Sequence, residues 1–186
     1  GELFNVISGY GFDSKDFISE NGAKVIKITN IGLGNFVEGG EFLPLKFIDE
    51  KSKFIANTND IVVALTRPII EGGIKVCKVP VGYDNSLVNQ RVAVIKTRKN
   101  LSDFLFLLLS SKEFINYVEE KSRSLMQPNL SINDLKKYKI PKPENEKIID
   151  ITNEENDVKE VIEGNKNLIK IYTQKIQDKI NKIWEI

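Results

Sequence analysis

The C-terminal segment carries a residue repeat that constrains the fold more than any other feature of the chain. Between positions 158 and 183, the seam positions are separated by 4, 3, 4, 3, 4, 4 and 3 residues, close to a coiled-coil repeat with one slip. They are Val158, Ile162, Asn165, Ile169, Tyr172, Ile176, Ile180 and Ile183. A helix of roughly 40 residues would be about 60 Å long, too long to bury this stripe against one small domain. The repeat therefore predicts a long helix that needs a partner helix.

The charges of this helix are segregated along its length. Residues 144–163 carry eight acidic and two basic side chains, whereas residues 164–182 carry five lysines and one Asp. Opposite charges would face each other between two antiparallel helices, and like charges would meet between parallel ones. We therefore expect an antiparallel partner, either a second copy or a homologous helix, with Asn165 fixing the register. The alternative is a solvated charged face without a partner.

The first 143 residues show a different pattern. Short β-branched or alternating runs cover residues 25–29, 60–66, 73–79 and 90–96, and turn residues separate them, as expected for strands. A helix is predicted from Ser102, which we expect to be its cap, to about Val118, and a second from Ser131, with Asp134 completing a capping box. We therefore expect an α+β protein with a β-rich domain and small helices at 1–143 and a long coiled-coil helix at 144–186.

The composition excludes several kinds of chemistry. The chain has no histidine and one cysteine, so it lacks Ser-His-Asp and Cys-His nucleophile pairs, an internal disulfide and a cysteine-based zinc site. Cys77 is interpreted as a buried strand cysteine. Because a single thiol cannot form an internal disulfide, we expect a cytoplasmic chain. No apolar run is long enough for a membrane span. No Pro-Pro pair, Walker-type loop or paired metal-binding carboxylates occur, and we expect no catalytic residue, metal or cofactor.

Four loop segments carry side chains suited to contacts with nucleic acid. Residues 1–143 hold 20 basic and 16 acidic residues, a mildly basic balance that permits such binding. Base edges are read by Arg, Asn and Gln, and phosphates are bound by basic, hydroxyl and amide groups. The candidate DNA-binding residues are Tyr10, Thr29, Asn30, Arg67, Gln90, Arg91, Arg123, Ser124, Gln127 and Asn129.

The order of these segments resembles one half of a type I restriction–modification specificity subunit, over essentially the whole chain. The resemblance depends on the order of several short segments. They are Ile28-Thr29-Asn30-Ile31, Asn59-Asp60-Ile61-Val62-Val63-Ala64, Gly72-Gly73-Ile74, Val88-Asn89-Gln90, a helix ending near Tyr117, Gln127-Pro128-Asn129-Leu130-Ser131 and Ile140-Pro141-Lys142-Pro143.

The resemblance implies a DNA target recognition domain followed by a spacer helix that pairs in an antiparallel coiled coil. It implies double-stranded DNA, a methyltransferase subunit and a restriction subunit as partners, with S-adenosylmethionine bound by the methyltransferase. The chain departs from the family in holding one recognition domain and one helix, so we expect a self-associating half-subunit or a fragment of a longer chain. Two alternatives remain: the recognition domain of a single-chain restriction–modification enzyme, and a coiled-coil oligomerisation module without a DNA role.

Overall fold

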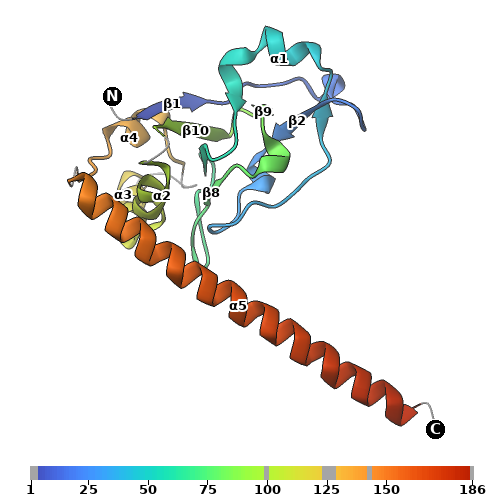
Figure 1. The fold of residues 1–186 in the computed structure, drawn as a ribbon. Helices are drawn as coiled ribbons and strands as arrows, with labels where there is room; N and C mark the ends of the chain where they lie inside the picture. Colours follow the sequence, from blue (N-terminus) through green and yellow to red (C-terminus); the bar gives the residue numbers. More distant parts are fainter. Residues whose placement is uncertain (1–3, 99–100, 123–128, 142–143, 185–186) are drawn as a thin grey trace. The chain divides into compact units, whose positions relative to one another are not determined.

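The computed structural model describes residues 4–98, 101–122, 129–141 and 144–184. The chain divides into two compact units, Gly1–Pro141 and Lys142–Ile186, whereas the sequence placed the boundary after residue 143. The first unit is rich in short strands with small helices, and the second is a long helix (Figure 1). The predicted α+β class with a long C-terminal helix is confirmed. No helix among the described residues is long and apolar enough to cross a bilayer.

The secondary structure elements of the described residues are mostly short. The strands are β1 Phe4–Ser8, β2 Ala23–Ile26, β3 Phe42–Leu43, β4 Ile55–Ala56, β5 Ile61–Ala64, β6 Ile69–Ile70, β7 Gly73–Ile74, β8 Val76–Lys78, β9 Ser86–Val88 and β10 Val92–Thr97. The α-helices are α1 Lys46–Glu50, α2 Ser102–Ser110, α3 Lys112–Ser122, α4 Ile132–Lys137 and α5 Asn145–Trp184. Single 3-10 turns lie at Ser14–Asp16, Ile28–Asn30, Ser52–Phe54 and Val81–Tyr83.

The central sheet has the order β1-β10-β5-β8 and is antiparallel throughout. All four residues of β5 have 0% exposure, which explains why this segment is an uninterrupted apolar run rather than an alternating one. Ile61 and Val63 belong to one core cluster, and Val62 and Ala64 belong to another. The sheet is therefore covered on both faces, as the alternation of side chains along a strand requires.

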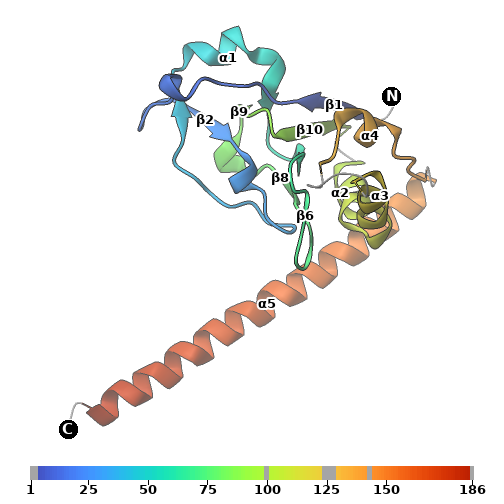
Figure 2. The same ribbon diagram turned by 180° about the vertical axis from the view of Figure 1, so that it is seen from behind.

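Each face of the central sheet has its own cover. On one face lie α2, α3 and α4, which place Leu105, Phe114 and Leu135 in the core with β5 and β10 and which group together in both ribbon views (Figures 1 and 2). On the other face lies a second sheet of order β3-β2-β9-β4, in which β2 and β9 are parallel. Its residues Ile26 and Val88 pack into the second core cluster.

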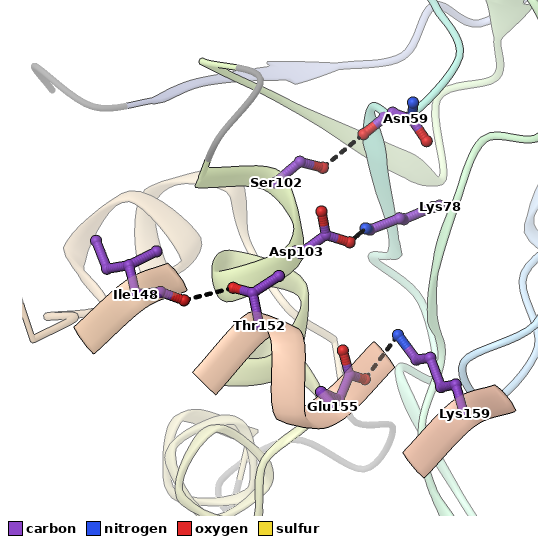
Figure 3. Close-up of polar contacts among 8 residues, drawn as sticks. All are labelled: Asn59, Lys78, Ser102, Asp103, Ile148, Thr152, Glu155 and Lys159. Atoms are coloured by element: carbon purple, nitrogen blue, oxygen red, sulfur yellow. Dashed lines mark hydrogen bonds and ion pairs between the residues drawn. The ribbon is translucent and has the colours of Figure 1, made fainter. Parts of the chain in front are cut away.

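The helices differ from the sequence prediction at two serines. The single helix expected from Ser102 to Val118 is wrong, because Ser111 is extended (φ −75°, ψ 158°) and separates α2 from α3. Its hydroxyl accepts a hydrogen bond from the Phe114 amide at 3.3 Å. Ser102 was expected to cap the first helix, but its hydroxyl donates to the carbonyl of Asn59 at 2.7 Å (Figure 3). The capping role predicted for Ser131 is confirmed, since its Oγ accepts from the Asp134 amide at 3.0 Å.

Helix α5 forms the second unit, and several polar contacts run along it. Along it, Thr152 donates to the Ile148 carbonyl at 2.6 Å, and Lys159 pairs with Glu155 one turn away at 2.6 Å (Figure 3). The seven apolar seam residues that the sequence identified are between 41% and 68% exposed. The helix therefore exists as predicted, and its seam side chains are exposed.

Candidate nucleic-acid interface

The strand registers bring the candidate loops to one edge of the two sheets. In the central sheet, Ser8 at the end of β1 pairs with Ala93, and Ala64 at the end of β5 pairs with Val92 at the start of β10. In the second sheet, Ile26 at the end of β2 pairs in parallel with Val88 at the end of β9. The loops after β1, β2, β5 and β9 therefore leave the sheets on the same side.

Backbone hydrogen bonds join these loops to one another. The Tyr10 amide donates to the Val88 carbonyl at 2.8 Å, and the Leu65 amide donates to the Arg91 carbonyl at 2.9 Å. The Leu130 amide donates to the Leu65 carbonyl at 2.8 Å, and the Asn89 amide donates to the Ile26 carbonyl at 2.9 Å, directly before the segment 27–31. We call the set of residues 9–11, 27–31, 65–68, 89–91 and 129–130 the loop edge. Five segments that are distant in the sequence thus form one continuous surface feature.

Five of the predicted DNA-binding residues lie exposed on the loop edge. They are Thr29, Arg67, Gln90, Arg91 and Asn129. Thr66 and Asn129 form an antiparallel bridge, so Asn129 lies next to the loop of Arg67. Gln90 and Arg91 occupy the turn from β9 to β10, beside the segment of Leu65. The structure therefore brings together polar residues that the sequence assigned to separate loops.

Asn30, which the sequence placed among the DNA-binding residues, is buried and stabilises a turn. It is 4% exposed, its Oδ1 accepts from the Lys27 amide at 2.7 Å, and its Nδ2 donates to the Val37 carbonyl at 2.8 Å. These bonds end β2 at Ile26 and close the 3-10 turn that replaces the strand expected to continue to residue 29. In this structure, both polar atoms of the Asn30 side chain are used by the fold and do not face a base.

Within the loop edge, Tyr10 and Gly9 contribute to packing. The ring of Tyr10 lies 5.1 Å from both Phe12 and Phe54, measured between ring centroids, and the ammonium group of Lys51 lies 4.2 Å from its centroid. A Cβ on Gly9 would lie 2.1 Å from the Asn89 carbonyl oxygen. The close neighbour of this glycine is therefore the protein's own backbone.

Lys75 is a residue of the loop edge region that the sequence did not single out. Its ammonium group donates to the Ile28 carbonyl at 2.8 Å, and its backbone amide donates to the Pro68 carbonyl at 2.7 Å. Burial lowers the pKa of the Lys75 ammonium group below its ordinary value of 10.5. Lys75 therefore ties the loop after β2 to the loop after β5. The alternating pattern of 73–79 indicated a strand residue and gave no signal of this contact.

Arg67 has an unusual backbone conformation for its residue type. Its φ is +47°, in the left-handed region, which costs an L-residue other than glycine roughly 1–2 kcal/mol. The segments on both sides are fixed by the hydrogen bonds of Leu65 and Pro68. The surrounding structure thus supplies the stabilisation that this conformation requires.

Three further predicted DNA-binding residues, Arg123, Ser124 and Gln127, lie outside the described residues. The structure shows the two ends of that loop, which are α3 ending at Ser122 and the bridge at Asn129. Because Asn129 belongs to the loop edge, the chain returns to this surface at residue 129.

A second polar group lies at the opposite end of the central sheet. Lys78 pairs with Asp103 (Figure 3), and Asp60 accepts from the Asn57 amide at 2.8 Å and lies 3.6 Å from the Lys96 ammonium group. Burial raises the pKa of the Asp60 carboxyl above its ordinary value of 3.8. The Lys78–Asp103 pair joins α2 to the sheet, and the Asp60 contacts link the start of β5 to β10 and to the preceding turn. We therefore assign these contacts a structural role. Cys77 is buried as expected, and burial raises the pKa of its thiol to about 12.

Comparison with known proteins identifies the family. The model of the type I restriction modification DNA specificity domain matches residues 1–182. The chain belongs to this family. It is 34% identical over 145 residues to the MjaVIII specificity subunit of Methanocaldococcus jannaschii and 32% identical over 145 residues to the EcoAI specificity subunit of Escherichia coli. Each match covers 76% of this chain but only 34% and 24% of the respective relative.

Solved structures show the same specificity-domain fold. A chain from a structure of the assembly and conformational transition of a type I R-M system matches with a TM-score of 0.61 at 14% identity, covering 88% of this chain and 37% of that one. The HsdS subunit of Thermoanaerobacter tengcongensis matches with a TM-score of 0.56 at 16% identity, with the same coverage. The predicted family is therefore confirmed, and the chain spans about a third or less of the curated relatives.

Proposed function

We propose that this chain reads a DNA sequence as one half of the specificity component of a type I restriction–modification system. The observation that carries the proposal is the loop edge, on which five exposed polar or basic residues predicted from the sequence come together in a specificity-domain fold. Loops held by a rigid sheet are where scaffolds present recognition groups. Methylation and cleavage would be supplied by partner subunits, with S-adenosylmethionine bound by the methyltransferase.

Two kinds of group on the loop edge support DNA binding. Arg67 and Arg91 are exposed cations on neighbouring loops, suited to phosphate or guanine contacts. Gln90 and Asn129 are exposed amides, suited to adenine. Thr29 adds a hydroxyl group. This mixture of positioning and reading groups is what a sequence-specific surface requires.

Helix α5 would serve as a spacer between two recognition domains. Its seam residues from Val158 to Ile183 are exposed, and its acidic and basic halves favour an antiparallel partner. The partner would be a second copy of this chain or a homologous helix. Two domains held at opposite ends of such a pair would contact two half-sites separated by a fixed length of DNA.

The direct test is the affinity of the chain for duplex DNA as a function of salt. We expect log Kd to rise linearly with log salt, because each neutralised phosphate releases counterions. Arg91→Gln should weaken binding and lower the salt slope by about 1 if Arg91 contacts a phosphate. Fluorescence anisotropy between 50 and 200 mM salt, values typical of such titrations, measures both quantities.

Arg98→Gln provides a matched control. Arg91 and Arg98 are both exposed and lie at opposite ends of β10, so only the first belongs to the loop edge. Equal losses in the two variants would indicate binding by net charge alone. Affinity that is independent of salt and of Arg67 and Arg91 would contradict the proposal.

A further inference from the structure

Arg67 combines an exposed cationic side chain with a backbone conformation that arginine disfavours. The other described non-glycine residues with positive φ are Asn21, Asn59 and Asn85, and asparagine enters this region more readily than other residues. Strained residues persist where the surrounding structure fixes them, and they concentrate at functional sites. Among the described residues of the loop edge, Arg67 is thus the one non-glycine residue with a positive φ.

The loop around Arg67 is fixed on both sides. Before it, the Leu65 amide donates to the Arg91 carbonyl, and the Leu65 carbonyl accepts from the Leu130 amide. After it, the buried Pro68 accepts from the Lys75 amide at 2.7 Å. The backbone at Arg67 is therefore held from three neighbouring segments, and the base of its side chain has a defined position and direction.

We propose that Arg67 reads a guanine in the major groove, donating both arms of its guanidinium group to the base edge. This inference rests on the proposed function. A bidentate contact with guanine O6 and N7 requires a guanidinium group held in a fixed orientation. A phosphate contact requires charge within reach and tolerates a mobile side chain, so it would not need a strained backbone. The fixed backbone at Arg67 serves the first requirement, because it sets the position and direction from which the guanidinium group extends.

Arg91 provides the contrast within the same surface. It is also exposed, and its carbonyl accepts from Leu65, but its backbone is not among those with positive φ. It lies in the turn closed by the bond from the Val92 amide to the Asn89 carbonyl at 3.0 Å. We assign Arg91 to the phosphate backbone, where it would position the domain.

The test uses the 186-residue chain and its Arg67→Lys and Arg91→Lys variants. A target is first obtained by repeated selection of a random duplex library on the wild-type chain. Affinity is then measured for the selected duplex and for one with its guanines replaced in turn. We expect Arg67→Lys to bind the selected duplex roughly 10- to 100-fold more weakly. At one guanine position, this variant should bind the original and the replaced duplex equally well. Its affinity for random DNA and its salt slope should not change.

The outcomes separate the two proposals. Arg91→Lys should keep the selected motif, since lysine still binds a phosphate. If Arg67→Lys retains discrimination at every guanine, or loses affinity equally for selected and random DNA, Arg67 is a phosphate contact and the inference is overturned. If the wild-type chain selects no motif, the proposed function itself fails.

A second variant separates reading from folding. Arg67→Asn places a residue that tolerates positive φ at this position, so we expect a higher urea midpoint together with lost discrimination. A lower urea midpoint would show that Arg67 serves the fold, and it would overturn the inference.

Discussion

The two units of this chain bury their apolar residues in opposite ways. In β5 of the first unit, all four side chains are fully covered, by helices on one face of the sheet and by a second sheet on the other. In α5 the seam side chains from Val158 to Ile183 remain 41–68% exposed. The first unit has a core on both faces of its central sheet, whereas the second presents an exposed apolar stripe, for which we propose a partner helix. Apolar side chains thus stabilise the fold in one unit and, under the proposed function, serve association in the other.

The largest effect is expected from removing a core side chain of the first unit. Phe114 is fully buried, with its ring 4.8 Å from that of Tyr138 between centroids. Phe114→Ala should lower the free energy of unfolding by about 3–5 kcal/mol, because it leaves a cavity. Urea denaturation measures the loss. Ile176→Ala in α5 should leave the unfolding of the first unit unchanged, and an equal loss in both variants would break the comparison.

The second effect concerns the seam of α5. Ile169→Asp together with Ile176→Asp should raise the dissociation constant of a helix pair by about 100-fold or more, because charge would be buried without a partner. Sedimentation equilibrium measures the change. Asn153→Asp with Asn167→Asp adds the same charge on the opposite face of the helix and should leave assembly intact. A monomeric parent chain would instead show that the partner helix belongs to another polypeptide.

A smaller effect should separate structure from recognition within the loop edge. Asn30→Ala removes two buried hydrogen bonds and should cost roughly 1–3 kcal/mol of stability. Thr29→Ala, at the exposed neighbour, should change stability by less than about 0.5 kcal/mol and weaken DNA binding. Thermal unfolding measures the stability of both variants, and fluorescence anisotropy measures their affinity for DNA. If Asn30→Ala keeps full stability and loses DNA affinity, our assignment of Asn30 to the fold is wrong.

The smallest effect is a pH dependence at the opposite end of the sheet. Burial raises the pKa of Asp60 above its ordinary value of 3.8, so the folded chain retains this proton at a pH where the unfolded chain has released it. The contribution of Asp60 to stability should therefore fall as pH rises from 3.8 through the folded pKa, and stay constant above it. Asp60→Asn should lack this dependence. Urea denaturation at several pH values gives the free energy of unfolding of the wild type minus that of Asp60→Asn. If this difference rises with pH across that range, burial is not the cause of the raised pKa.

The sequence predicted the features that depend on local pattern. The apolar run at 61–64, the helix cap at Ser131 and the long helix all follow from residue periodicity or from contacts a few positions apart. The break at Ser111 also has a local feature, the bond from the Phe114 amide to its hydroxyl, but the continuous apolar spacing of this segment predicted one helix. The hydroxyl bond from Ser102 joins residues 43 positions apart, and local propensity does not identify so distant a partner.

The same distinction applies to the candidate site. Residue type identified Arg67, Gln90 and Arg91 as DNA-binding candidates, and the strand registers place them on one edge. The burial of Asn30 was not predictable, because an asparagine that closes a turn and one that reads a base look alike in sequence. Lys75 was missed because its partner is a carbonyl oxygen from the segment at Ile28.

The way in which the loop edge is joined has a consequence for how such proteins diversify. The bonds that link Tyr10 to Val88, Leu65 to Arg91 and Leu130 to Leu65 run between backbone atoms, which every residue except proline can supply in full. Replacing the exposed side chains of these loops therefore leaves the linkage intact. Gly9 is an exception, since any side chain there would collide with Asn89. Under the proposed function, a lineage carrying this scaffold can acquire a new DNA target by point substitution, while its architecture is inherited unchanged.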